Sequence, residues 1–327
     1  MNRGGVAVVA EHTKGVLGDI TLEMLACGRE LADASRTELT CIILTDNPGP
    51  FEALPLAADR TIIVKDPALA SFNPEAYVRV LGHLLKDLSP SLVLFGSTGM
   101  GMDLDGPLSI ALGATVISGC AKIQFAEGKL RFASRLYGGK LVAQSEVDGG
   151  LALALLMAGN YPKEGGMRDR VPPVEVQTPP APLTGLRVQF RELIEPEAGD
   201  VDLTKAPILV GAGRGIQARE NLDKLTELAR LLGGALCASR PVIDQGWLPR
   251  SRQVGRSGAI VKPRLYLALG ISGAPEHLEG IRESDLIVAI NTDETAPIFD
   301  VAHYGAVHDL LKVVPHLIEA VRAAREG

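Results

Sequence analysis

The chain carries, at residues 265–277, the stretch Leu-Tyr-Leu-Ala-Leu-Gly-Ile-Ser-Gly-Ala-Pro-Glu-His, in which an apolar run passes directly into a glycine-rich turn. A short apolar run bounded by glycines is typical of a buried strand. A second glycine-rich turn, Gln-Val-Gly-Arg-Ser-Gly, precedes it at residues 253–258. Two such turns around one strand predict an α/β unit with a ligand site beside the carboxyl end of that strand.

The segment around these turns is basic, although the protein as a whole is acidic. Residues 245–275 contain five Lys and Arg residues and no acidic one, whereas the whole chain has a formal net charge of −6. Backbone N–H groups of glycine-rich turns bind anions, and nearby guanidinium groups add positive charge. We therefore expect an anionic ligand in this segment.

The rest of the second half repeats the strand-and-turn pattern. An amphipathic run predicts a helix at Glu220–Leu232, and two further helical stretches separated by Pro315 are expected to close the chain. The strands are expected at Ala206–Val210, Ala235–Ala238, Leu265–Leu269 and Leu286–Ile290, and the turns after them at 211–215, 238–241, 270–277 and 291–293. In an open α/β sheet such turns converge on one crevice.

The first half also alternates strands with helices, which predicts a mainly parallel sheet. Thr21–Ala32 has helical periodicity, and Asn73-Pro74-Glu75 is a typical helix start. Two runs joined around Gly138-Gly139 predict an antiparallel pair attached to the sheet. The parallel strands are expected at Val6–Ala10, Leu39–Leu44, Arg60–Val64 and Ser91–Phe95, and the antiparallel pair at Leu130–Arg135 and Lys140–Val147.

A proline-rich segment lies between the two halves. Val171–Pro182 holds five prolines and predicts an extended connector, followed by a strand at Arg187–Leu193. The domain boundary is expected in the Pro/Gly/acidic segment Glu195–Asp202. These patterns predict an α/β protein with two Rossmann-like parallel-sheet domains, residues 1–198 and 199–327.

Composition excludes several classes of protein. The chain is 46% hydrophobic, 22% charged and only 4% aromatic, which disfavours nucleic acid as a partner. Its longest apolar run, Leu151–Ala158, is too short to span a bilayer, and the N-terminus lacks a signal-peptide pattern. The four cysteines show no metal-binding or C-x-x-C spacing and are expected to be buried reduced thiols. We expect a cytoplasmic protein with no integral membrane segment.

Polar residues in the predicted turns are suited to hold an anion or a planar ring. Arg214 lies inside a glycine turn, and Ser239-Arg240 directly follows a strand. A guanidinium group stays charged and stacks on rings, and the Ser257 hydroxyl can donate to a ring nitrogen. Each of these positions also has a structural alternative: a tight β–α turn at 211–215, a surface arginine with a capping serine at Ser239-Arg240, and a turn serine at Ser257.

His277 and Asn291 also lie where a bound ligand would reach them, although a lone histidine is more often structural and Asn291 also suits an Asx turn. No catalytic triad, P-loop lysine, paired carboxylates or metal cluster emerges from the sequence. An ordinary hydrolase or NTPase is therefore not expected.

The stretch from Pro207 to Pro315 resembles the C-terminal domain of the electron transfer flavoprotein α-subunit, the FixB-like family. The resemblance extends more loosely over the first half of the chain. It rests on ordered motifs at the family's spacing: Gly213-Arg-Gly215, Ala238-Ser-Arg240, Gln253-Val-Gly255, Ser257-Gly258, Gly270-Ile-Ser-Gly-Ala274, His277, Ala289-Ile-Asn291 and Lys312-Val-Val-Pro315.

This resemblance implies a subunit that pairs with a β-subunit and binds FAD mainly through its C-terminal domain, an electron carrier rather than an enzyme with its own substrate. Electrons would pass from a dehydrogenase of the acyl-CoA dehydrogenase type, as in fatty acid β-oxidation, to a quinone reductase or another acceptor. The first domain, with a nucleotide-hydrolase-like fold, would contact the β-subunit. Carried over by position, the FAD-binding residues would be Arg214, Ser239, Arg240, Gln253, Val254, Gly255, Arg256, Ser257, Gly258, Ser272, Gly273, Ala274, His277, Asn291, Asp309 and Leu310.

The resemblance also implies roles around the flavin ring, with Ser257 near N5, Arg240 over the ring and His277 near the carbonyl oxygen O2. A fixed positive charge about 4 Å from a reduced flavin is worth at most ~4 kcal/mol at an effective dielectric constant of ~20, or roughly 90 mV for a two-electron couple. Arg240 and His277 are therefore expected to tune the flavin potential.

The chain departs from the family pattern at several positions. Arg256 replaces the usual glutamine, Ala259 a lysine, Glu276 a glutamine and His303 an aspartate, and residues 102–108 lack the two arginines usual there. These changes bear on the flavin potential and on the partner.

Two modes of electron transfer remain open: a simple carrier, or a bifurcating complex in which the β-subunit holds a second FAD rather than AMP and meets NADH. A different class is a non-redox adenine-nucleotide-binding regulatory module, which the departures at 256, 276 and 303 favour. A hydride-transferring enzyme acting alone is disfavoured because the sequence offers no acid/base constellation.

Overall fold

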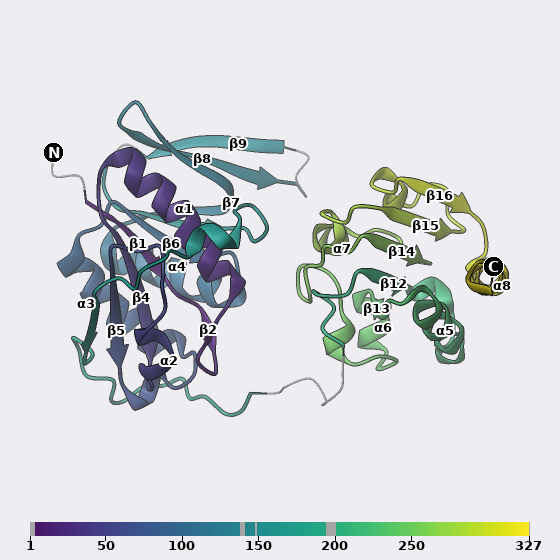
Figure 1. Cartoon of the computed structure of the whole chain (residues 1–327), viewed down its shortest axis with the longest axis horizontal. Coiled ribbons are helices and arrows are strands. Elements are labelled where there is room, and N and C mark those ends of the chain that lie inside the picture. The colour runs from purple at the N-terminus through teal and green to yellow at the C-terminus, as the bar shows by residue number, and fades with distance from the viewer. Residues whose placement is uncertain (1–3, 138–140, 148, 194–200, 327) are drawn as a thin grey trace. The chain divides into compact units, whose positions relative to one another are not determined.

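The computed structural model describes residues 4–137, 141–147, 149–193 and 201–326, which form two compact units, Met1–Glu192 and Leu193–Gly327 (Figure 1). The domain boundary expected at 198/199 lies outside the described residues, as does the turn expected at Gly138-Gly139. Each unit is an α/β fold with its own parallel sheet and its own hydrophobic core.

The sheet of the first unit has nine strands in the order β11-β5-β4-β1-β6-β10-β7-β8-β9. The strands from β11 to β7 are parallel, and β8 and β9 extend the sheet as an antiparallel ribbon, as the sequence predicts. Their bounds are β1 (Val6–Val9), β4 (Leu39–Thr45), β5 (Arg60–Lys65), β6 (Leu92–Gly96), β7 (Thr115–Ala126), β8 (Lys129–Leu136), β9 (Leu141–Val147), β10 (Ala152–Leu156) and β11 (Val174–Gln177), beside a small hairpin of β2 (His12–Thr13) and β3 (Val16–Leu17).

Helices cover both faces of this sheet because successive side chains of a strand point to opposite faces. Val6 and Val8 of β1 belong to the core shared with α1 (Asp19–Ser35), whereas Ala7 and Val9 belong to the core shared with α3 (Pro74–Leu88) and α4 (Gly99–Leu112). A short helix, α2 (Gly49–Glu52), follows β4. The expected start of α3 is confirmed, since the Asn73 side chain accepts a hydrogen bond from the Ala76 N–H at 3.1 Å.

The second unit has a five-stranded, wholly parallel sheet in the order β13-β12-β14-β15-β16. The helices α5 (Leu222–Leu232) and α8 (Leu310–Glu326) share one core, and α7 (Pro275–Ile281) contributes to the other. The strands are β12 (Ile208–Ala212), β13 (Ala235–Ala238), β14 (Leu265–Leu269), β15 (Ile287–Asn291) and β16 (Tyr304–Val307), and a short helix, α6 (Arg240–Asp244), follows β13.

Three sequence predictions need correction. Residues 187–193 form no strand: the Glu75 carboxylate accepts the N–H groups of Arg187 and Val188, so this segment is held by a side chain. The proline-rich connector does hold a strand, β11, which pairs with the edge strand β5. Pro315 lies inside the continuous helix α8, where burial of Val314 and Ile318 offsets its missing hydrogen bond.

Candidate functional site

The strand order of the second unit creates a crevice at a defined place. From β12 the chain passes to β13 on one side and then returns to β14 on the other side. In open α/β sheets, ligands bind outside the carboxyl ends of the strands at such a switch point. The turns after β12 and β14 are therefore the first place to search for a ligand site.

At the switch point these two turns pack backbone against backbone. The Gly213 N–H donates to the Leu269 carbonyl at 2.8 Å, and the Gly215 N–H donates to the Gly270 carbonyl at 3.1 Å. A Cβ atom on Gly213 would overlap the Gly270 carbonyl group, so only glycine fits there. Arg214, which lies between the two glycines, is exposed.

The carboxyl end of β13 contributes Ser239 and Arg240. Ser239 is buried, and its N–H donates to the Ala212 carbonyl of β12 at 3.0 Å, whereas the Arg240 side chain is 69% exposed. Asp244 lies 3.3 Å from Arg240 Nε, one helical turn along α6. The guanidinium group therefore projects into solvent with a carboxylate at one edge.

The loop 253–258 lies beside the end of β13, to which it is joined by a bridge between Ala238 and Gln253. Gln253 Nε2 donates to Ser257 Oγ at 2.8 Å, a bond that leaves the Ser257 hydroxyl hydrogen able to donate elsewhere. The side chains of Gln253 and Val254 are buried, while Arg256, Ser257 and Gly258 form an exposed tip. Gly255 has φ of +136°, which favours glycine.

His277 lies in the first turn of α7 and is only 6% exposed. Its Nε2 lies 3.0 Å from the Tyr266 hydroxyl, and its Nδ1 lies 3.0 Å from the Val254 carbonyl oxygen. Burial, partly opposed by the hydrogen bond with Val254, lowers the pKa of His277 from 6.5 to about 4. The ring is therefore neutral at neutral pH in this structure, which differs from the charged group expected at this position.

The remaining predicted residues follow β14, β15 and β16. Asn291 forms an Asx turn with Asp293 and also donates to the Ile271 carbonyl at 2.9 Å, and Asp309 accepts from the Leu311 N–H at the start of α8. Leu310 is buried in the core, so its side chain does not face a ligand. Ser272 and Ala274 are exposed around Gly273, whose φ is +85°.

The structure thus brings all sixteen predicted residues to the turns, strand ends and first helical turns at or beside the carboxyl ends of the five parallel strands of the second unit. Three of these residues have buried side chains and can contact a ligand only through their backbone groups: Gln253, Val254 and Leu310. Sequence reasoning missed Gly270 as a partner of Gly213 and Tyr266 as the partner of His277. A tyrosine in the middle of a buried strand was the available signal, because a buried hydroxyl needs a hydrogen-bond partner.

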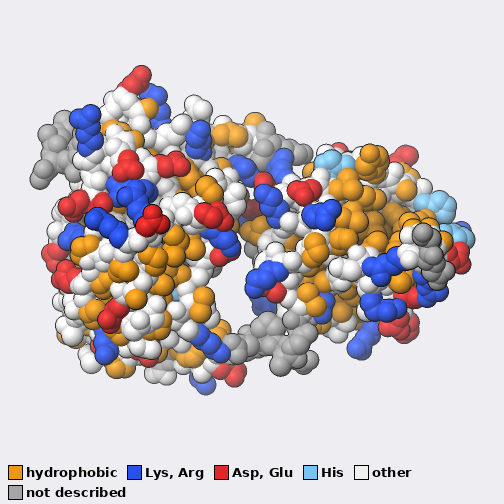
Figure 2. Space-filling model, viewed as in Figure 1, with side chains coloured by type: hydrophobic (Ala, Val, Ile, Leu, Met, Phe, Trp, Pro, Cys, Tyr) orange, Lys and Arg blue, Asp and Glu red, His pale blue; other side chains and the backbone are white. Residues whose placement is uncertain are grey.

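Arginines and carboxylates both lie around this site, and Arg240 is paired with Asp244. On the second unit in Figure 2, Lys and Arg side chains lie on the side where Figure 1 places α7 and also on the side of α5 and α8. The exposed arginines Arg214, Arg240 and Arg256 all lie in the turns described above. Exposed arginines beside glycine-rich turns at strand ends fit an anionic, nucleotide-like group such as a pyrophosphate.

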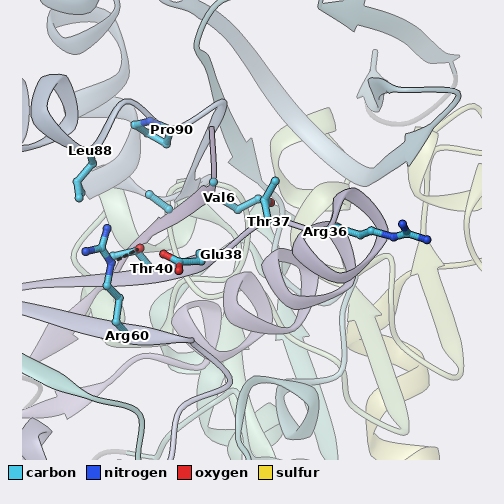
Figure 3. A pocket seen from close by; sticks show the side chains of 10 residues that line it. Val6, Arg36, Thr37, Glu38, Thr40, Arg60, Leu88 and Pro90 are labelled. Atoms are coloured by element: carbon cyan, nitrogen blue, oxygen red, sulfur yellow. Dashed lines mark hydrogen bonds between the residues drawn. The ribbon is translucent and has the colours of Figure 1, made fainter. Parts of the chain in front are cut away.

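A cavity of about 430 Å³ in the first unit lies at the opposite, amino ends of β1, β4 and β5 (Figure 3). In it, Arg60 Nε donates to Thr40 Oγ1 at 3.1 Å, while the Arg36 side chain points away from both. Ligand sites of parallel α/β sheets lie at carboxyl ends rather than amino ends. We therefore place the candidate site in the second unit.

Other kinds of site receive no support from the described part of the chain. Among the described residues, no group of three or more His, Cys, Asp or Glu side chains is arranged to hold a metal ion. The described helices also include none that is long and apolar enough to cross a membrane. All four cysteines are buried and none forms a disulfide bond.

Comparison with known sequences decides the family. Residues 6–182 match the electron transfer flavoprotein domain, and residues 202–282 match the electron transfer flavoprotein FAD-binding domain. The chain belongs to the electron transfer flavoprotein α-subunit family. The FAD-binding match lies in the second unit and contains both glycine turns of the switch point.

Relatives in this family align along almost the whole chain. Protein FixB of Clostridium saccharobutylicum is 35% identical over 322 residues, which cover 96% of this chain and 95% of the relative. The electron transfer flavoprotein subunit alpha of Clostridium acetobutylicum is 35% identical over 327 residues (98% and 97%), and that of Bacillus subtilis is 33% identical over 316 residues (96% of each). The resemblance drawn from the motifs is thereby confirmed.

Proposed function

We propose that the chain is the FAD-carrying α-subunit of a heterodimeric electron transfer flavoprotein that works in the cytoplasm. One observation carries the proposal: the residues matched to the FAD-binding domain contain a glycine cradle at the switch point of a parallel sheet. A bound FAD would supply one- and two-electron transfer, and the chain's own groups would bind and orient it.

Within this proposal, different turns bind different parts of the cofactor. The turns around Gly213 and Gly270, together with the exposed Arg214, are assigned to the pyrophosphate because they lie at the switch point of the sheet. Glycine is needed at both positions because a Cβ atom there would meet the backbone of the other turn. The exposed tip of the loop 253–258 offers the Ser257 hydroxyl and the Arg256 charge to the ring end, and Arg240 adds a second charge. The other predicted contacts remain part of the proposal through their placement at the same edge of the sheet.

The partners are proposed from the family. A β-subunit would complete the heterodimer, an acyl-CoA dehydrogenase-type flavoprotein would donate electrons, and a quinone reductase or similar protein would accept them. The FixB and electron transfer flavoprotein names of the relatives support an electron-transfer role in general.

The test is to co-express the chain with its β-subunit and to measure the visible spectrum and the flavin content of the purified complex. One FAD per complex, reduced by an acyl-CoA dehydrogenase and not by NADH, would establish a simple carrier. Two FAD and reduction by NADH would establish bifurcation. A complex with no flavin bands that binds an adenine nucleotide would replace the proposal with the non-redox binding module.

A further inference from the structure

A line of hydrogen bonds crosses the core of the second unit from β13 to the loop 253–258. Cys237 Sγ lies 3.6 Å from the Tyr266 hydroxyl, which lies 3.0 Å from His277 Nε2, and His277 Nδ1 lies 3.0 Å from the Val254 carbonyl oxygen. Cys237 and Tyr266 are 0% exposed, and Val254 is 1% exposed. The tyrosine and histidine rings meet edge-on at a centroid distance of 5.9 Å.

The direction of each bond follows from what its atoms can do. A carbonyl oxygen only accepts, so His277 Nδ1 carries the hydrogen. The neutral ring then has a lone pair on Nε2, to which the Tyr266 hydroxyl donates. The tyrosine oxygen in turn accepts from the Cys237 thiol. Each donor in the line therefore points toward the loop, and the histidine tautomer is fixed.

The end of this line is the base of the glycine-rich loop. Val254 is followed by Gly255, which packs so closely against Gly280 of α7 that a Cβ atom on Gly280 would meet the Gly255 backbone. The Arg256 N–H donates to the Glu276 carbonyl at 2.7 Å. His277 is thus the side chain that ties the loop to α7, while two backbone contacts flank it.

We propose that Tyr266 is a positioning residue, which acts through His277 to hold the loop 253–258 against α7. The inference rests on the proposed function only in assigning that loop to the cofactor. The buried tyrosine would not contact the ligand itself; it would set the ring orientation and the tautomer of His277, and so the place of the loop that carries Arg256 and Ser257.

Removal of the Tyr266 hydroxyl should loosen the loop 253–258 without unfolding the rest of the unit. In Tyr266→Phe, His277 Nε2 becomes a buried acceptor without a donor, and such a group shifts a conformational equilibrium by roughly 5- to 150-fold. The ring is then free to turn toward water and release the Val254 carbonyl. We expect amide hydrogen exchange in residues 254–259 to accelerate at least 5-fold. Five N–H groups of this segment donate hydrogen bonds that exist only when the loop is closed: those of Val254, Gly255, Arg256, Gly258 and Ala259.

The experiment measures this exchange in the full chain by mass spectrometry, first without added FAD. Tyr77→Phe is the matched control, because Tyr77 is also a buried tyrosine whose hydroxyl donates a hydrogen bond, to the Leu44 carbonyl in the first unit. Faster exchange in 254–259 for Tyr266→Phe, with β12 and β14 still protected and Tyr77→Phe unchanged at the loop, supports the proposal. A loop that exchanges at the wild-type rate in folded Tyr266→Phe overturns it.

Two substitutions of His277 separate its contact with Tyr266 from its contact with Val254. They test the proposal even if Tyr266→Phe fails to fold. An asparagine amide reaches the position of Nδ1 and can still donate to Val254, whereas a glutamine amide reaches the position of Nε2 and can contact only Tyr266. We expect His277→Asn to keep more loop protection than His277→Gln. Greater loop protection in His277→Gln than in His277→Asn contradicts the proposal that the bond from His277 to Val254 holds the loop.

Two further measurements separate this inference from the proposed function. The ¹⁵N shifts of the His277 ring should show Nδ1 protonated and Nε2 unprotonated at neutral pH, and the opposite tautomer contradicts the assigned direction of the line. FAD is then titrated into the complexes that the wild-type and Tyr266→Phe chains form with the β-subunit. If FAD binds, its affinity should fall at least 5-fold in the variant, and an unchanged affinity contradicts the positioning role. If the wild type binds no flavin, the proposed function fails while the exchange result stands alone.

Discussion

Arg240 and His277 differ in charge at neutral pH, the property that matters most beside a flavin. Arg240 is exposed and carries a guanidinium charge, part of which Asp244 at 3.3 Å offsets. His277 is buried, and its pKa is lowered to about 4, so it is neutral. Arg240 is therefore the better candidate for raising the potential of a bound flavin.

Replacement of Arg240 by alanine should lower the flavin midpoint potential by tens of millivolts. Removal of a positive charge disfavours the anionic reduced flavin, and solvent around an exposed side chain keeps the shift below the roughly 90 mV limit for a single charge. Arg230→Ala on α5 is the control, since Arg230 is also exposed in this unit but does not follow a strand. Redox titration of the holoprotein measures the shift, and equal potentials for both variants would remove Arg240 from this role.

The buried His277 also predicts how stability depends on pH. Its pKa is about 4 in the folded chain and about 6.5 in the unfolded chain. As pH falls from 6.5 to 4, the unfolded chain binds a proton that the folded chain does not, so the free energy of unfolding falls, by at most about 3 kcal/mol. His277→Asn should flatten that part of the profile.

Denaturation of the second unit between pH 4.5 and 7 measures this slope. Of the groups around the ring, Tyr266 and Cys237 stay neutral throughout because burial raises both pKa values, that of Cys237 to about 12. Glu276 and Glu279 on α7 are present in both proteins and cancel in the comparison. Identical pH slopes for the wild type and His277→Asn would show that the buried ring does not carry the effect.

At the scale of elements, apolar runs predicted most strands of both sheets, because a buried parallel strand is apolar on both faces. The strand β16 was missed because Tyr304–Val307 is short and exposed, and its residues carry no burial signal. In Figure 2, hydrophobic side chains gather over the part of the second unit that contains β15 and β16. Pro315 indicates a break between two helices in the sequence, because local sequence does not reveal the packing of α8 on α5.

Helix α3 offers a direct test of local propensity. Gly82 lies in its middle, and a Cβ atom there would have no neighbour within 4 Å. Gly82→Ala should therefore raise the free energy of unfolding by up to about 1 kcal/mol, because alanine restricts the unfolded chain and favours the helix. Gly101→Ala in α4 is the contrasting case, since a Cβ atom there would overlap the Gly96 carbonyl oxygen of the backbone. Thermal denaturation of the two variants should move in opposite directions.

The site was predictable to the extent that it rests on the topology of parallel strands. Glycine turns at strand ends converge whatever the details of packing, which is why Arg214, Ser239 and Ser257 lie at one edge of the sheet. The neutral state of His277 was not predictable, because desolvation arises from elements distant in the sequence. Its contact with Tyr266 depends on how α7 packs against β14, which residue spacing does not reveal.

For the whole molecule, separate cores predict separate responses to the cofactor. Every proposed FAD contact lies in the second unit, whose core residues all come from 203–318. FAD at 100 times its Kd should stabilise this unit by about 2.7 kcal/mol. Hydrogen exchange with and without FAD should show new protection in 201–326 and none in the core strands β1 and β4. Protection confined to the first unit would move the site there.

The buried cysteines have a practical consequence. Burial raises the pKa of Cys27, Cys41 and Cys237 to about 12 and that of Cys120 to about 11, so no native thiol forms an accessible thiolate near neutral pH. Maleimide dyes and spin labels should therefore leave the folded wild-type chain unmarked. A single cysteine introduced on the surface of each unit would then be the only labelled position in that unit, which makes the chain ready for distance measurements between its two halves during electron transfer.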